Sequence, residues 1–281
     1  MRNSVLSKIL AIVVLYNKEI VESDTLTSLE SDLLSNGSQL DVLIYDNSPQ
    51  PHALPNFKGV NFVSYIWNET NPGVSLAYNE GVKFAQGNNK QWVLLLDQDT
   101  KFEAGALDAY VKSLLGDSEI KLFCPLILLE NSTIFSPFRK KFKRGVTLKE
   151  VKLRAYSLKK YSPVNSGILV EVKAFNDAGG YNEKVKLDFS DLEFIDRFSK
   201  KNKSFQVISA VATQDFSNNN ADINALIKRF SYFCQGAKNC NKDGFVDEIQ
   251  YLFVVLIRAT MLTIRTKKAI FYTMLYKEYI K

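Results

Sequence analysis

The sequence predicts an α/β fold in which helices flank a mainly parallel sheet, followed by a helical C-terminal extension. Apolar runs alternate with amphipathic helical segments through the first hundred residues, which is the pattern of βαβ units. From residue 247 onward, apolar residues are interleaved with basic ones at helical spacing. The chain has 281 residues, of which 46% are hydrophobic and 23% charged, and this composition excludes general disorder.

The first half of the chain alternates strands with helices. We expect strands over residues 9–16, 42–45, 60–66 and 92–96. The first is apolar throughout, as expected of a strand that is covered on both faces. A helix capped by Ser23 or Asp24 then runs to Asn36-Gly37, and a second helix follows Asn71-Pro72-Gly73 and ends at Gly87.

The second half is less regular. The periodicity predicts helices over residues 102–115 and 188–200 and from residue 247 onward, and strands over 120–129 and 164–172. Pro125 is a candidate interruption of the strand over 120–129. We find no internal repeat in the sequence.

Three polar clusters follow predicted strands. They are Tyr16-Asn17, Asp46-Asn47-Ser48 and Asp97-Gln98-Asp99. In open α/β sheets ligands bind beyond the carboxyl ends of the strands, so we expect these clusters to converge in space.

Each acidic cluster has two interpretations. Asp97 and Asp99 can hold a divalent cation against a diphosphate, or they can cap the next helix; we favour the metal. Asp46 and Asn47 can bind a nucleobase edge or form an Asx turn, and these alternatives stay open. Asp191, which shares a helix face with an aspartate three residues earlier, can act as a general base or favour the helix dipole.

Several site classes are excluded or disfavoured. The three cysteines show no CxxC spacing, and the single histidine, His52, rules out a multi-histidine metal site. We expect His52, which stands between prolines, to be a solvated loop residue. No GxGxxG motif follows the first strand and no GxxxxGK[ST] motif is present, which disfavours a dinucleotide-binding fold and a P-loop.

The charge distribution suggests an anionic partner. The net charge is +6, while residues 139–160 alone contain ten basic residues and one acidic residue. Residues 258–281 add six basic residues against one acidic residue. Such segments can lie on an anionic membrane face, although residues 251–257 can instead pack on the core.

No apolar run reaches the ~18 residues that a spanning helix requires. The run over residues 9–16 leads into Asn17-Lys18-Glu19 without a small-residue cleavage site, so it does not resemble a signal peptide. We expect a cytoplasmic protein that associates peripherally with the inner face of the cell membrane.

Taken in order, five segments resemble family 2 glycosyltransferases, most closely their rhamnosyltransferase-like branch. The matching segments are residues 11–17 (AIVVLYN), 44–48 (IYDNS), 71–81 (NPGVSLAYNEG), 94–100 (LLLDQDT), and 165–167 (NSG) continuing through 179–182 (GGYN) to 188–197. Together they cover about residues 9 to 200. Each segment alone is weak evidence for the family, but all five in the family's order are strong evidence.

The resemblance implies a glycosyltransferase-A fold, a uridine or thymidine diphosphate sugar as donor, and inversion at the anomeric carbon. It implies a catalytic domain over residues 1–220, with a nucleotide-binding half (9–100) and an acceptor-side half (101–220), before the extension over 221–281. The implied donor-binding residues are Tyr16, Asn17, Asp46, Asn47, Asn79, Asp97 and Arg197. Asp191 would be the base, and Asp99 with Asp97 would hold Mn²⁺ or Mg²⁺.

Two positions depart from the family pattern. Ser190 precedes the base where a glutamate is common, and Gln214-Asp215 occupies about the place of a metal-binding histidine. The acceptor that the resemblance implies is a lipid-linked saccharide in cell-surface polysaccharide assembly, such as an O-antigen or capsule. A non-catalytic nucleotide-sugar-binding module and, more distantly, a basic nucleic-acid-binding protein are the alternatives. Asp99 and Asp191 argue against the first, and the basic stretch lacks a nucleic-acid motif, so we expect no nucleic-acid partner.

Overall fold

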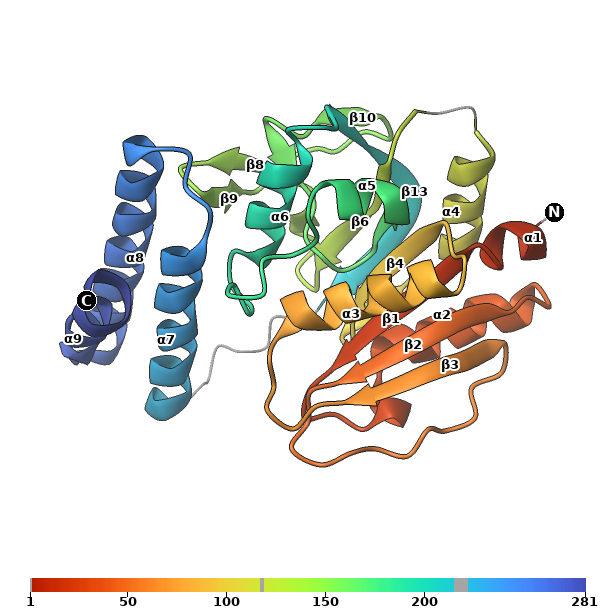
Figure 1. The fold of residues 1–281 in the computed structure, drawn as a ribbon, viewed down its shortest axis with the longest axis horizontal. Coiled ribbons are helices and arrows are strands. Elements are labelled where there is room, and N and C mark those ends of the chain that lie inside the picture. Colours follow the sequence, from red (N-terminus) through yellow and green to blue (C-terminus); the bar gives the residue numbers. More distant parts are fainter. Residues whose placement is uncertain (1, 117–118, 215–221) are drawn as a thin grey trace.

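The computed structural model describes residues 2–116, 119–214 and 222–281, and it has an α/β architecture built on one ten-stranded mixed sheet (Figure 1). The strands of this sheet are β1 (Ile9–Leu15), β2 (Leu40–Asp46), β3 (Val60–Trp67), β4 (Trp92–Asp97), β5 (Thr100–Phe102), β6 (Leu122–Leu129), β7 (Ile134–Ser136), β10 (Ala155–Ser157), β12 (Ile168–Glu171) and β13 (Ser204–Gln214). Their order is β10-β13-β6-β12-β4-β1-β2-β3, with β5 beside β13 and β7 beside β6. A small second sheet contains β8 (Phe138–Lys141), β9 (Arg144–Val146) and β11 (Tyr161–Ser162).

The helices cover both faces of the main sheet and extend it at one end (Figure 1). They are α1 (Arg2–Leu6), α2 (Asp24–Ser35), α3 (Val74–Gly87), α4 (Ala106–Leu115), α5 (Val172–Asp177), α6 (Ser190–Phe198), α7 (Ile223–Asn239), α8 (Phe245–Thr266) and α9 (Ile270–Met274). The expected α/β class, with helices on both faces and helices at the C-terminal end, is therefore confirmed.

Strand β1 shows why the sheet lies between two helical layers. All seven of its residues are buried, as its apolar sequence predicts. Ile9, Ala11 and Val13 belong to the core cluster that contains α2 and α4, whereas Leu10 and Ile12 belong to the cluster that contains α3, α5 and α6. Successive side chains of a strand point to opposite faces, so an apolar residue at every position fills two cores.

The strand register brings the polar clusters to one edge. Strand β1 pairs in parallel with β2 and β4, with Leu15 opposite Asp46 and Val14 opposite Asp97. Beyond β4 the sheet is mixed, because β12 is inserted antiparallel between β4 and β6. Pro125 lies within β6 without ending it, and β12 begins only at Ile168.

The C-terminal helices form a third apolar cluster. Helix α7, which lies in the predicted helical extension but has no separate bounds in the sequence analysis, packs with α8 and α9 around Phe230, Cys234 and Tyr251. Val185 and Phe189, from the segment before α6, belong to the same cluster. Within residues 251–257, Tyr251, Val254 and Val255 are buried while Leu252, Phe253, Leu256 and Ile257 are exposed. One side of α8 therefore packs on its neighbours and the other faces outward.

Two lysines of the basic stretch form ion pairs with carboxylates of the helices. Lys140 and Lys143 form ion pairs with Asp196 of α6, at 2.7 and 3.3 Å, and Lys143 also reaches Asp247 of α8 at 2.9 Å. These residues tie the β8–β9 hairpin to both helices. In the described part of the chain, no helix is both long and apolar enough to cross a membrane.

Candidate active site

Gln98 joins the ends of β1 and β4. Its side-chain oxygen accepts a hydrogen bond from the Tyr16 amide at 2.8 Å, and its side-chain nitrogen donates to the Tyr16 carbonyl at 3.0 Å. The Tyr16 side chain itself remains 40% exposed. The middle residue of Asp97-Gln98-Asp99 thus holds the backbone at the mouth of the site and leaves the Tyr16 ring free to contact a ligand.

Asp46 is the centre of a buried hydrogen-bond network. Its carboxylate accepts hydrogen bonds from the Ser48 amide at 2.9 Å, the Tyr65 hydroxyl at 2.8 Å and His52 Nδ1 at 2.7 Å. Burial acts to raise the pKa of Asp46, but these hydrogen bonds outweigh it and lower the pKa below its usual value. The bond to Ser48 has the Asx-turn pattern, so this interpretation of the motif describes the local structure.

His52 is not the solvated loop residue that the sequence analysis expects. Its side chain is only 12% exposed, and it bonds to Asp46 while its second ring nitrogen lies 3.5 Å from Glu19. The sequence alone does not predict this contact, because it depends on how the loop between β2 and β3 folds back toward the end of β2. Tyr65, on β3, is a second member of this network that the sequence analysis misses.

Asn47 and Asn17 lie beside this network. Asn47 is 2% exposed, and its side-chain oxygen has no hydrogen-bond partner among the described residues. Asn17 has a positive φ of 50°, and its amide donates to the Ser48 hydroxyl at 3.0 Å. A buried acceptor without a partner is unfavourable, so the Asn47 oxygen is a candidate contact for a ligand donor group.

Asp97 and Asp99 do not cap a helix. The residue after them, Thr100, begins strand β5, and the next helix starts at Ala106 with Gly105 at its N-cap. Asp97 accepts a hydrogen bond from the buried Tyr78 hydroxyl at 2.8 Å. The Gln214 side chain of β13 donates to Asp99 at 2.9 Å. The alternative of a helix cap is therefore wrong.

Asp191 lies in the first turn of α6 and completes a group of three carboxylates with Asp97 and Asp99, which we call the acidic edge. Burial, followed by the charges of Asp99 and Asp191, raises the pKa of Asp97 to about 7. Burial also raises the pKa of Asp99, and it raises the pKa of Asp191 to about 6 with a contribution from Asp188. Because the three carboxylates are largely buried, they repel one another when all of them are ionised. A bound cation would stabilise this ionised state of the acidic edge.

A chain of hydrogen bonds links the end of β4 to the start of α6. The Asp97 amide donates to the Ser166 hydroxyl at 3.1 Å, and this hydroxyl lies 2.7 Å from the Thr100 hydroxyl. The adjacent Asn165 accepts from the Tyr181 hydroxyl at 2.7 Å and donates to the Ser190 hydroxyl at 3.1 Å. Ser190, which departs from the family pattern, thus helps to fix the helix end that carries Asp191.

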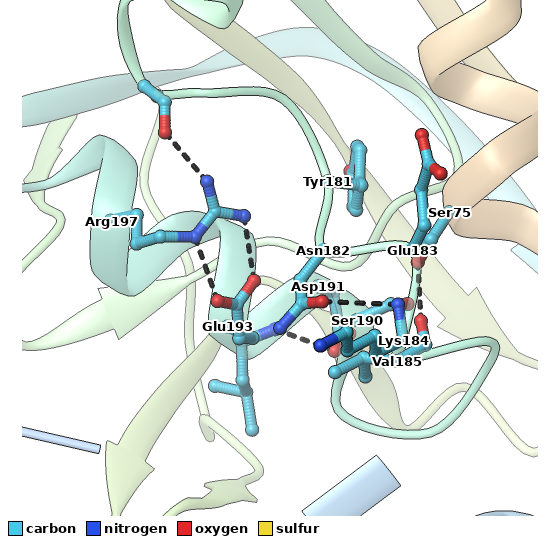
Figure 2. A network of polar contacts seen from close by, with 12 residues as sticks. Ser75, Tyr181, Asn182, Glu183, Lys184, Val185, Ser190, Asp191, Glu193 and Arg197 are labelled. Atoms are coloured by element: carbon cyan, nitrogen blue, oxygen red, sulfur yellow. Dashed lines mark hydrogen bonds and ion pairs between the residues drawn. The ribbon is translucent and has the colours of Figure 1, made fainter. Parts of the chain in front are cut away.

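Arg197 is engaged within α6. Its guanidinium forms two hydrogen bonds with the buried Glu193, at 2.8 and 2.7 Å, and donates to the Ala178 carbonyl at 2.6 Å (Figure 2). Figure 2 also shows Asp191 on the same helix as this pair. The bidentate geometry favours a structural role for Arg197, and its contact with the donor stays a prediction.

Asn79 joins α3 to the loop before α6. Its side-chain oxygen accepts from the Tyr181 amide at 2.8 Å, and its side-chain nitrogen donates to the Tyr181 carbonyl and to Glu183, both at 2.9 Å. A Cβ at Gly180 would lie 2.8 Å from the Asn79 oxygen, at a φ of +62°. Only glycine therefore allows this close approach. Contact of Asn79 with the donor also stays a prediction.

The acidic edge is suited to share a divalent cation with a ligand. Among the described residues, no group of three or more His, Cys, Asp or Glu side chains is placed to hold a metal by itself. Mg²⁺ sites often use only one or two carboxylates, with substrate phosphates and water completing the shell. Asp99 and Asp97 fit that pattern, since both have raised pKa values and no cationic partner within salt-bridge distance in the described structure. Asp215, a candidate third ligand, lies outside the described residues.

The fold and this arrangement agree with the comparison with known families. Residues 10–172 match the model of glycosyl transferase family 2. No curated protein matches the chain significantly. The matched region covers more than half of the chain and includes β1, β2, β4 and the polar clusters that follow them. The chain belongs to glycosyl transferase family 2, and it is a glycosyltransferase that uses a nucleotide-sugar donor.

Proposed function

We propose that the protein inverts the anomeric carbon as it moves a hexose or deoxyhexose from a uridine or thymidine diphosphate sugar to a saccharide acceptor. The observation that carries this proposal is the acidic edge. It combines Asp191, a carboxylate on α6 that has no cationic partner among the described residues, with two carboxylates at the end of β4. The nucleoside is expected at Tyr16, Asn17, Asp46 and Asn47, on the neighbouring strand ends.

In this mechanism Asp191 accepts the proton of the acceptor hydroxyl as the hydroxyl oxygen attacks the anomeric carbon. The bond from that carbon to the diphosphate breaks on the opposite side, and the nucleoside diphosphate leaves. Asp99 and Asp97 would hold a divalent cation, which would neutralise charge on the diphosphate. A pKa of about 6 leaves Asp191 ionised at neutral pH, while its basicity exceeds that of an ordinary aspartate.

We further propose a lipid-linked acceptor in cell-surface polysaccharide assembly, in keeping with the rhamnosyltransferase-like branch. The support is the outer face of α8, which consists of Phe245, Ile249, Phe253, Leu256, Ile257 and Ile264, all exposed. These residues follow one side of the helix, and large exposed apolar patches mark interaction surfaces. A membrane surface would cover this face and bring the enzyme to its acceptor, with residues 221–281 acting as a separate extension of the catalytic domain over 1–220.

Asp191→Asn tests the proposed chemistry. The purified variant is expected to lose ~10²–10⁴-fold in transfer rate, because it lacks the general base, while nucleotide-sugar binding stays within a few-fold. Asp177→Asn is the matched control, since Asp177 is an exposed aspartate that pairs with Lys173 on α5. Donor and acceptor screens with product analysis by mass spectrometry and NMR would measure the rate and the anomeric configuration. Transfer by Asp191→Asn within tenfold of the wild type, or retention of configuration, would reject the mechanism.

A further inference from the structure

A cavity of about 370 Å³ lies between the catalytic part of the chain and the C-terminal helices. We call it the interhelical pocket. It is bounded by the turn between β8 and β9, the start of α6, and the facing sides of α7 and α8. Its apolar wall includes Leu192, Leu226, Phe230, Phe233, Val254 and Leu262. Figure 1 shows the hairpin β8–β9 close to α8, on the side of the molecule where the C-terminal helices lie.

The polar wall of the pocket has an excess of positive charge. It contains Lys143, Arg144, Arg229 and Arg258 but only one acidic side chain, Asp188. Arg229 pairs with Asp188 at 2.9 Å, and Lys143 is held by two carboxylates outside the pocket. Arg144 and Arg258 make no ion pair with any acidic side chain in the described part of the chain.

The arginines repel one another across the pocket. Burial lowers the pKa of Arg258, and Arg229 and Arg144 lower it further, although Asp188 acts in the opposite direction. Arginine keeps its proton under these conditions, so the repulsion is relieved only by an anion. Guanidinium groups that converge on one space also match the geometry of phosphate oxygens.

The pocket adjoins the proposed base. Asp188, Phe189 and Leu192 line it, so Asp191 lies on the same turn of chain. One oxygen of Asp188 is buried without a hydrogen-bond partner among the described residues, which leaves an acceptor for a ligand hydroxyl. Asp191 does not itself line the pocket, so a ligand would have to reach it across the first turn of α6.

We propose that the interhelical pocket binds the phosphate or diphosphate group of an acceptor that carries an apolar chain. Arg144, Arg229 and Arg258 contact the phosphate oxygens, and the apolar wall holds the first carbons of the chain. The attached saccharide then extends toward Asp191. This inference rests on the proposed function, since it takes the acceptor to be a saccharide on a phosphorylated lipid. It adds that the C-terminal helices complete the acceptor site.

The test measures binding to the full chain by calorimetry, without any donor sugar. Farnesyl diphosphate is the probe, inorganic diphosphate lacks the chain, and uridine diphosphate reports on the donor side. The variant Arg144→Gln/Arg258→Gln removes two exposed cations without exposing Asp188, because Arg229 stays in place. Arg139→Gln is the matched control, since this exposed arginine lies in the same basic stretch but outside the pocket.

We expect the wild type and Arg139→Gln to bind farnesyl diphosphate more tightly than inorganic diphosphate. The double variant should bind farnesyl diphosphate ~10–100-fold more weakly, with uridine diphosphate binding unchanged. Unchanged farnesyl diphosphate binding would overturn the proposal. An equal loss of uridine diphosphate binding would also overturn it, because the pocket would then belong to the donor site.

A second arm separates the acceptor from membrane lipid. Flotation with phosphatidylglycerol vesicles should change less than twofold in the double variant, whereas an equally large loss would assign the arginines to lipid headgroups instead. Failure of the proposed function is distinguishable from failure of the pocket. If no sugar transfer occurs but farnesyl diphosphate binding depends on the arginines, the pocket stands. If transfer occurs while the acceptor KM of the double variant equals that of the wild type, the pocket is wrong.

Discussion

The acidic edge and the interhelical pocket lie on either side of the first turn of α6, and they have opposite charge. The acidic edge contains Asp97, Asp99 and Asp191, and its two strand-end carboxylates have no cationic partner within salt-bridge distance in the part of the chain that the structure describes. The interhelical pocket contains four cationic side chains against Asp188 alone. The acidic edge has an excess of negative charge, and the interhelical pocket has an excess of positive charge. Under the proposed function, the first would hold a cation that offsets the charge of a diphosphate, whereas the second would accept an anion directly.

If both proposals hold, this difference lets one short helix serve two anionic substrates. A donor diphosphate and an acceptor phosphate would repel each other if they shared one basic site. Placing carboxylates and a cation on one side, and arginines on the other, separates them. The pair Lys143–Asp247, at 2.9 Å, fastens α8 to the hairpin and so keeps the cationic side in place.

The largest effect is expected when the proposed cation ligand of the acidic edge is removed. Asp99→Ala is expected to weaken Mn²⁺-dependent binding of uridine diphosphate by at least about tenfold, and more than Asp97→Ala does. Calorimetry with and without Mn²⁺ measures this. Gln214→Ala is the control. It removes the side chain that donates to Asp99 at 2.9 Å but leaves the Asp99 carboxylate in place. Equal metal dependence in the wild type and Asp99→Ala would contradict the assignment.

A second experiment tests whether the C-terminal side faces a membrane. Phe253→Ser/Ile264→Ser on the outer face of α8 is expected to reduce flotation with anionic vesicles by at least about tenfold, since each CH₂ removed from lipid costs about 0.8 kcal/mol and both side chains lose several carbons. Leu34→Ser on α2 is the control, because Leu34 is also exposed, at 53%, but on another face of the molecule. Absence of the wild-type protein from the floated fraction at low salt would show that the membrane assignment is wrong.

The smallest effect concerns stability. The pKa of Asp97 rises from its ordinary 3.8 to about 7 on folding, so the folded state binds the proton more tightly. Stability therefore falls as the pH rises from about 4 through 7. Without divalent cations, Asp97→Asn is expected to be more stable than the wild type at pH 8, on the order of 1 kcal/mol, and this gain is expected to be smaller at pH 5.

Denaturant titrations of the wild type and of Asp97→Asn at the two pH values measure this gain. Asp177→Asn should bring no gain at pH 8, because pairing with Lys173 lowers the pKa of Asp177 instead. A gain for Asp97→Asn that is the same at both pH values would mean that packing, and not charge, explains it.

Much of the structure of residues 9–100 could be predicted from local sequence. The continuous apolar run of β1, the cap at Ser23, which accepts a hydrogen bond from the Leu26 amide, and the stop after Ser35 all follow from short-range rules. The convergence of Tyr16, Asp46 and Asp97 also follows, because parallel strands end at one edge. Helix α7 lies within the helical extension expected over residues 221–281, but its bounds were not predicted, although Leu226, Phe230 and Cys234 follow a helical period. Its apolar side packs on the other C-terminal helices and on Val185 and Phe189 before α6, which only the tertiary structure shows.

The sequence by itself determined the α/β alternation, the family and the acidic residues at strand ends, since these depend on residue type and on spacing within one element. Tertiary structure alone decided what surrounds each of them. The bond from His52 to Asp46, the clamp of Gln98 on Tyr16 and the arginines of the interhelical pocket join residues on different elements. No local pattern records such contacts, because chain topology and packing bring those side chains within hydrogen-bonding distance.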